Sequence, residues 1–250
     1  MRDWIAGHAR AAYWIWVALC LPLVGVLNAL GLPLLAVYLV CLCWIAGGWF
    51  LINFGVSRRL RAAVQTLDQD CDPEPMLELC RTVLRQNPKS VIYRLNGGFA
   101  LLALGRREEA AAELAGLEGN RRIWKNSSLA LSYCSCRLDL AGDLEEAAAW
   151  LDRMEAHADK KPATARTLEE QRACLALRRG ETQGLEPIFL AALERAATAR
   201  MQVAWRWELA ALYRMEGRQA EAREHLEYVA AHGNKLYVKA GAEKLLAQLG

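Results

Sequence analysis

Charge is absent from one long stretch of this chain. Residues 11–57 contain no Asp, Glu, Lys, Arg or His, a run of 47 residues. One membrane-spanning helix needs about 20 apolar residues, so the run accommodates two helices and a turn. A cleaved signal peptide is a competing interpretation, but its apolar core covers only about 7–15 residues. The run therefore predicts a two-helix transmembrane hairpin, with a single span or a re-entrant segment as the alternatives.

Turn-forming residues divide the uncharged run near its middle. Asn28, Gly31 and Pro33 favour a turn, which places the two predicted spans at residues 11–27 and 34–54. Arginines flank both outer ends of the run, and none lies near the turn; they are Arg2, Arg10, Arg58, Arg59 and Arg61. Because basic residues favour the cytoplasmic side of a membrane, we expect a multi-pass protein of the inner cell membrane with both termini in the cytoplasm.

The familiar signatures of catalytic and metal sites are also missing. The chain has no HExxH, CxxC, GxGxxG, GxxxxGK[ST] or GxSxG pattern. Its eight cysteines are scattered, as expected of small buried side chains in a reducing compartment. The carboxylate pairs at 108–109 and 145–146 occupy adjacent helix positions, which do not face each other. We therefore expect no catalytic residue, no metal ligand, no cofactor and no enzyme activity.

Strand patterns and a strongly basic balance are absent as well. Alternation of apolar and polar residues does not occur, so no sheet is expected. The sequence beyond the uncharged run is rich in Ala, Leu, Glu and Arg, which favour helices. The formal net charge is +3, and residues 62–250 are close to neutral, which argues against a nucleic-acid partner. These features predict an all-α fold.

A glycine recurs at a nearly fixed interval. Gly105, Gly142, Gly180 and Gly217 are separated by 37, 38 and 37 residues. A period in this range is typical of stacked supersecondary units. An alanine follows five residues after three of these glycines, and a leucine after the fourth; they are Ala110, Ala147, Ala222 and Leu185. Each glycine is expected to end one helix just before the next begins.

Apolar residues at helical spacing surround these glycines. They predict helix pairs over residues 90–117, 128–156, 166–196 and 203–231, and a final helix over 235–249. Asn87-Pro88 ends an earlier helix, because proline cannot continue an interior turn.

Helix pairs with a glycine hinge and an alanine five residues later resemble tetratricopeptide repeats. Residues 203–236 match that pattern best, through Leu209, Ala210, Tyr213, Gly217 and Ala222. Segments 91–122 and 128–161 match well, whereas 57–90 and 166–199 are degenerate, and the tryptophan that begins each family repeat is missing throughout. The resemblance covers about four fifths of the chain. It implies a cytoplasmic tail (1–10), the hairpin (11–56), about five repeats (57–234) and a capping helix (235–250).

The resemblance also implies an α-solenoid with a concave groove that binds a protein or peptide. The groove residues it suggests are Phe99, Ser132, Asp139, Glu170, Arg178, Trp207 and Arg214. Phe99 and Trp207 could instead pack between repeats. The expected function is a membrane-tethered adaptor or assembly scaffold, attached to the bilayer through residues 11–56. The alternative is an accessory or regulatory subunit of a membrane transporter or envelope enzyme that acts through the hairpin. The sequence leaves the oligomeric state open.

Overall fold

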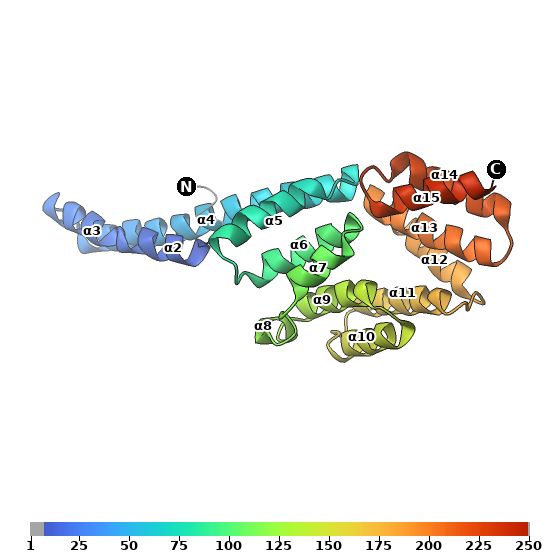
Figure 1. Ribbon diagram of the computed structural model, residues 1–250. Helices are drawn as coiled ribbons and strands as arrows, with labels where there is room; N and C mark the ends of the chain where they lie inside the picture. The colour runs from blue at the N-terminus through green and yellow to red at the C-terminus, as the bar shows by residue number, and fades with distance from the viewer. Residues whose placement is uncertain (1–7, 250) are drawn as a thin grey trace.

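The computed structural model describes residues 8–249, and all of its regular secondary structure over that range is helical (Figure 1). This confirms the predicted all-α fold. The helices are α2 (Ala9–Ala18), α3 (Cys20–Ala29), α4 (Leu34–Asp70), α5 (Glu74–Gln86), α6 (Val91–Ala103), α7 (Arg107–Leu114), α8 (Arg121–Trp124), α9 (Ser127–Leu140), α10 (Leu144–Ala156), α11 (Pro162–Arg178), α12 (Leu185–Glu194), α13 (Ala199–Met215), α14 (Gln219–His232) and α15 (Tyr237–Leu249). The short helix α8 lies where the sequence indicated a connection.

Two helical stretches at the start of the chain could span a membrane. Residues Ala11–Ala29 and Leu34–Asp70 are long and apolar enough to do so. Most of the large hydrophobic side chains that remain exposed in the described part of the chain belong to α2, α3 and α4. Five of them are at least 67% exposed: Trp14, Leu21, Leu30, Leu34 and Leu35. Water would be an unfavourable environment for such a surface, whereas lipid suits it.

The first predicted span is interrupted. Helix α2 ends at Ala18, and α3 begins at Cys20. Pro22 explains the break, because its nitrogen has no hydrogen to donate to the carbonyl oxygen of Ala18. Of the arginines used for orientation, Arg2 and the side chain of Arg10 lie outside the described residues.

A reciprocal pair of tryptophans joins the two legs of the hairpin. The Trp16 Nε1 donates to the Trp44 carbonyl oxygen at 2.8 Å, and the Trp44 Nε1 donates to the Trp16 carbonyl oxygen at 3.0 Å. The two rings stack with centroids 4.5 Å apart. Gly48 makes room for this pair, since a β-carbon there would lie 2.1 Å from the Trp16 ring. Both indole N–H groups therefore have an acceptor within the hairpin. Lipid acyl chains offer no such acceptor.

Helix α4 continues without a break from the apolar stretch into the charged part of the chain. The predicted end of the second span at residue 54 and the predicted domain boundary at 56–57 both fall inside it. It ends at Asp70, and the next residue, Cys71, has a left-handed φ of 52°. One continuous helix therefore joins the hairpin to the rest of the chain (Figure 1).

Three of the recurring glycines follow the end of a helix in a left-handed conformation, as expected at a helix end. Gly105, Gly180 and Gly217 have φ values of 73°, 88° and 76°, which other residues rarely adopt. Gly142 works differently. The Asp143 carboxylate accepts from the Glu146 backbone N–H at 2.8 Å, and the Glu146 carboxylate accepts from the Gly142 N–H at 2.9 Å. This reciprocal cap starts α10.

Small side chains allow consecutive helices to pack closely. A β-carbon on Gly98 of α6 would lie 2.7 Å from the Leu114 side chain of α7. Ala110, Ala147 and Ala222 are at most 2% exposed. Helices α5 and α6, α6 and α7, α9 and α10, and α12 to α15 pack against their neighbours in the chain.

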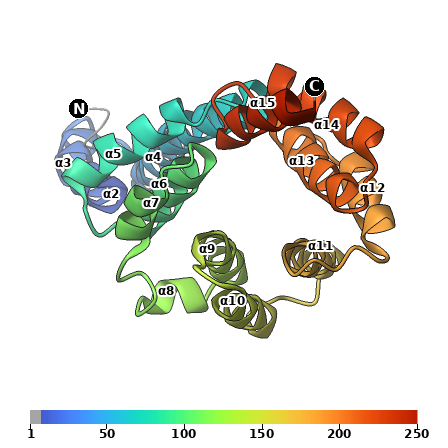
Figure 2. The same cartoon turned by 45° about the vertical axis from the view of Figure 1, so that its right-hand side comes forward.

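The segment from α13 to α15 contacts the end of α4 and the turn that follows it. Helix α13 packs against α4, and the Arg200 guanidinium pairs with Asp68 at 2.7 Å. The Asn234 amide donates to the Asp70 carbonyl oxygen at 2.7 Å, and the Lys235 ammonium lies 2.8 Å from Asp72. Helices α4 to α15 consequently form a ring (Figure 2), whereas the resemblance suggested an array with free ends.

Apolar packing supports the same closure. One buried cluster contains Leu67 of α4 together with Val203, Leu226 and Val238 of α13, α14 and α15. At the start of α15, the Tyr237 β-carbon lies 2.8 Å from where a β-carbon on Gly105 would be. The turn between α6 and α7 therefore touches α15 across the ring.

Candidate functional site

Five side chains from five different helices of the ring lie within electrostatic range of one another. They are Arg107 of α7, Asp139 of α9, Arg178 of α11, Glu208 of α13 and Tyr237 of α15, and they are called the inner cluster below. The Arg178 guanidinium lies 3.4 Å from the Asp139 carboxylate. The Arg107 guanidinium donates to the Asp139 carbonyl oxygen at 2.7 Å. The charges on Asp139, Glu208, Arg178 and Arg107 all act on Tyr237.

The inner cluster is partly exposed to solvent and partly buried. The side chains of Asp139 and Arg178 are 44% and 42% exposed. Burial among the surrounding helices nevertheless raises the pKa of Asp139, against the lowering effect of Arg178 and Arg107. Asp139 is therefore accessible to solvent in part, although the surrounding helices desolvate its carboxylate.

Glu208 is the unusual member of the inner cluster. Burial raises its pKa to about 7; Arg178 lowers the pKa, and the charge of Asp139 raises it. No hydrogen bond to its carboxylate is found within the described residues. Near neutral pH, Glu208 is therefore present in both forms. The ionised form attracts a cation, and the protonated form can donate a hydrogen bond.

Cys174 lies beside the inner cluster on α11 and is 8% exposed. Burial, and then the charge of Glu208, raise its pKa well above the usual value for a thiol. The nucleophilic form of cysteine is the thiolate, so this environment does not favour covalent chemistry. Within residues 8–249, no group of three or more His, Cys, Asp or Glu side chains could hold a metal ion.

The predicted groove residues occupy three kinds of position. Asp139 and Arg178 belong to the inner cluster. Glu170, 19% exposed, pairs with Arg195 at 3.2 Å. Ser132 and Arg214 are exposed, and the Ser132 hydroxyl donates to its own helix at Ser128.

The two aromatic groove candidates pack against other helices. The Arg200 guanidinium lies 5.2 Å from the centre of the Phe99 ring, at the contact that closes the ring. Trp207 packs against α15, because a β-carbon on Gly241 would lie 2.8 Å from its indole. This is the packing role that the sequence left open for both residues.

Sequence reasoning missed Arg107, Glu208 and Tyr237. Glu208 is adjacent to Trp207 in the chain, but the family analogy assigns no inward position to it. Arg107 lies in the first turn of α7 and Tyr237 in the first turn of α15, at places that indicate only helix starts. These residues meet because the ring closes, and no local pattern predicts that closure.

Comparison of the chain with protein-family models, with curated proteins and with solved structures finds no match.

Proposed function

We propose that this chain is a membrane-tethered, TPR-like α-solenoid that binds a protein or peptide partner at its inner cluster. In this proposal the hairpin spans the inner membrane twice, both termini lie in the cytoplasm, and the ring acts there as an adaptor or assembly scaffold. The observation that carries the proposal is the continuity of α4. A single helix has an exposed apolar surface at one end and forms part of the charged ring at the other.

Three features support a TPR-like arrangement. Helices follow one another in pairs, three of the four recurring glycines are left-handed, and the alanines that follow Gly105, Gly142 and Gly217 are buried. The missing repeat tryptophan and the closed ring distinguish the chain from the family pattern. A partner would then enter the hollow of a ring and contact the charged side chains there.

Tethering suits a scaffold for physical reasons. Confinement to a surface raises the effective concentration of the ring towards other membrane-bound proteins, without any added contact. A continuous helix between hairpin and ring would also restrict the orientation of the ring relative to the bilayer, which reduces the entropy lost on binding.

A function through the hairpin is the second candidate. Gly25 and Gly47 have no atom within 4 Å of where a β-carbon would be. Small residues of this kind allow another transmembrane helix to approach closely. An accessory subunit of a transporter or envelope enzyme would use this surface.

Cross-linking in intact membranes, followed by purification of the full chain, tests the proposal. The variant Arg178→Glu with Glu208→Lys reverses two inner-cluster charges and keeps the net charge. We expect it to lose most of its cross-linked partner, because removing one partner of a buried charge pair at an interface costs roughly 2–5 kcal/mol of binding free energy. The matched control is Arg179→Glu with Glu169→Lys, two exposed residues outside the inner cluster, one just after the end of α11 and one in its middle.

Each outcome separates the two candidates. A scaffold loses its partner in the inner-cluster variant and retains it in the control. Retention of the partner in the inner-cluster variant, together with its loss in Gly47→Leu, would replace the scaffold by the hairpin function.

A further inference from the structure

The turns between α5 and α12 divide into two sets, one on the side of the hairpin and one on the opposite side. After its apolar first part, α4 leads away from the hairpin, and the longer helices from α5 to α11 alternate in direction (Figure 1). Arg59 of α4 and Thr82 near the end of α5 line the same pocket. Burial raises the pKa of Tyr93 at the start of α6, and Arg59 is close enough to oppose that rise, so the turn before α6 faces the hairpin. The Arg94 guanidinium donates to the Glu113 carbonyl oxygen at 2.6 Å and to that of Ala115 at 2.7 Å. The end of α7 therefore lies on the same side.

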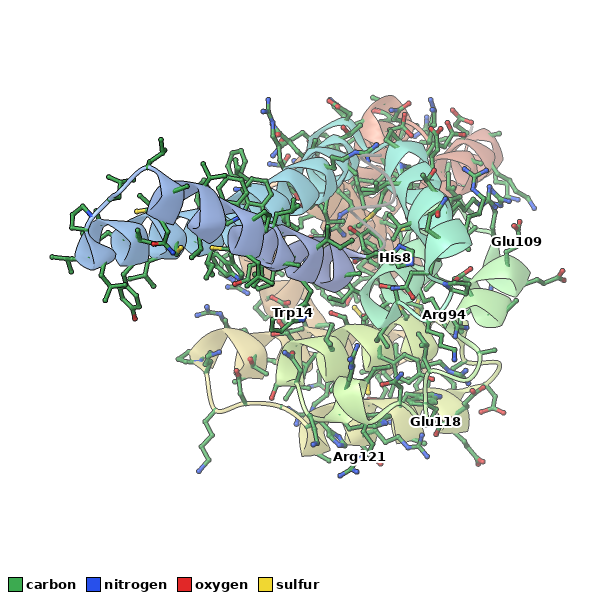
Figure 3. The ribbon with its side chains drawn as sticks, turned by 90° about the vertical axis from the view of Figure 1, so that its left-hand side faces the viewer. His8, Trp14, Arg94, Glu109, Glu118 and Arg121 are labelled. Carbon is green, nitrogen blue, oxygen red and sulfur yellow. The ribbon has the colours of Figure 1, made fainter. Side chains whose placement is uncertain are left out.

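Further contacts place the turns between α7 and α11 on the same side as the hairpin. Arg153 near the end of α10 pairs with Glu118, which follows α7. The Trp124 ring of α8 lies 4.6 Å from the His157 ring after α10. We call the turns at residues 87–90, 115–126 and 157–161 the hairpin-side rim. Figure 3, seen from the hairpin side, shows Glu118 and Arg121 below the hairpin in that view.

Cations are concentrated on the hairpin-side rim. It has six Lys or Arg residues against two acidic ones. All six are exposed: Lys89, Arg121, Arg122, Lys125, Lys160 and Lys161. Both acidic residues are paired, Glu118 with Arg153 and Asp159 with Lys161. Lys161 is the only one of the six in an ion pair within the described residues, so five positive charges face solvent without a counter-charge.

The turns on the opposite side have the reverse balance. Residues 104–109, 141–146 and 179–184 contain six acidic residues against three arginines. Several of these carboxylates lie in the first turn of a helix, where they are stabilised by the helix dipole. The charge of this part of the ring therefore changes sign along the direction of the hairpin, and its positive side faces the bilayer in which the hairpin would lie.

We propose that the hairpin-side rim binds the anionic lipid headgroups of the leaflet from which the hairpin emerges. This inference rests on the proposed membrane-spanning hairpin. Anionic lipids give the cytoplasmic surface a negative potential that attracts nearby basic residues and decays within about 8–10 Å at physiological salt. The continuous α4 keeps the rim close to that surface, so binding is effectively intramolecular. The ring is thereby attached at two places, by the hairpin and by the rim.

Hydrogen–deuterium exchange of the full chain in lipid nanodiscs tests this inference. One set of discs contains only zwitterionic phosphatidylcholine, and the other contains phosphatidylcholine with added anionic phosphatidylglycerol. We expect amides of residues 115–126 and 157–161 to exchange about tenfold more slowly on the anionic discs. The difference should disappear at about 1 M salt, where the screening length falls to about 3 Å.

Two double variants complete the experiment. Arg121→Glu with Lys160→Glu should abolish the difference between the two lipids, while Arg179→Glu with Lys244→Glu, away from the rim, should preserve it. Equal exchange of the native chain on both kinds of disc would overturn the rim contact. Failure of the hairpin to insert is a separate outcome, because the chain would then not co-purify with either disc.

Discussion

Gly105→Ala should lower the free energy of unfolding by about 3 kcal/mol, whereas Gly116→Ala should lower it by only about 1 kcal/mol. Both glycines have a φ of 73°, so the backbone strain of an alanine is the same at each. The added β-carbon at residue 105 would lie 2.8 Å from the Tyr237 β-carbon, while at residue 116 it would meet nothing within 4 Å. The difference between the variants isolates the contact between the α6–α7 turn and α15.

Denaturant unfolding of the full chain in mild detergent measures this difference. Amide exchange should locate the damage in Gly105→Ala at the start of α15, because Tyr237 cannot retreat without moving its backbone. Equal losses of stability in the two variants would mean that α15 does not press on the turn between α6 and α7, and the ring would then be open at this point.

Glu208→Gln should raise the free energy of unfolding at pH 8 by up to about 3 kcal/mol. The pKa of Glu208 rises from 4.5 to about 7 in the folded chain. A carboxyl with a raised folded pKa contributes stability that is complete below pH 4.5 and is lost as the pH rises through about 7. Glutamine keeps the shape of the protonated acid and has no charge to desolvate.

Other ionisable groups around Glu208 also affect how the free energy of unfolding varies with pH. Arg178 favours its charged form, whereas the charge of Asp139 opposes it. Burial raises the pKa values of Asp139 and Cys174, and of Tyr237 on α15. Asp139 therefore adds to the loss of stability as the pH rises, and the two other groups titrate at higher pH.

Unfolding of the native chain and of Glu208→Gln between pH 4.5 and 8 checks this prediction, with the exposed Glu169→Gln as the matched control. The native chain and the control should lose stability as the pH rises, and Glu208→Gln should lose much less. A native chain whose stability is unchanged or increases over that interval would show that Glu208 is not held in a desolvating environment.

Local features of the fold could be predicted from the sequence because local chemistry determines them. Gly105, Gly180 and Gly217 adopt the left-handed backbone expected at a helix end, and Asp143 caps α10. The sequence also indicated the continuity of α4, because no proline occurs between Pro33 and Pro73. Pro22 likewise indicated the break between α2 and α3 at Leu19.

The candidate site could be predicted only in part, because it depends on contacts between distant residues. Asp139 and Arg178 lie on inward helix positions that the family analogy identified. Asp68 and Arg200 pair across 132 positions of sequence, and no periodicity indicates such a pairing. Glu208 and Tyr237 face the inner cluster because of this closure, and Trp207 is covered by α15 for the same reason.

The central claim is that the hairpin crosses the membrane twice and holds the ring on the cytoplasmic face. Labelling of single cysteines in intact cells with a membrane-impermeant thiol reagent tests it most directly, in a variant lacking the native cysteines. Leu30→Cys, in the hairpin turn, should react from outside, and Ser57→Cys, after the apolar stretch, should react only once the membrane is permeabilised. Reaction of Ser57→Cys from outside in intact cells would contradict the account.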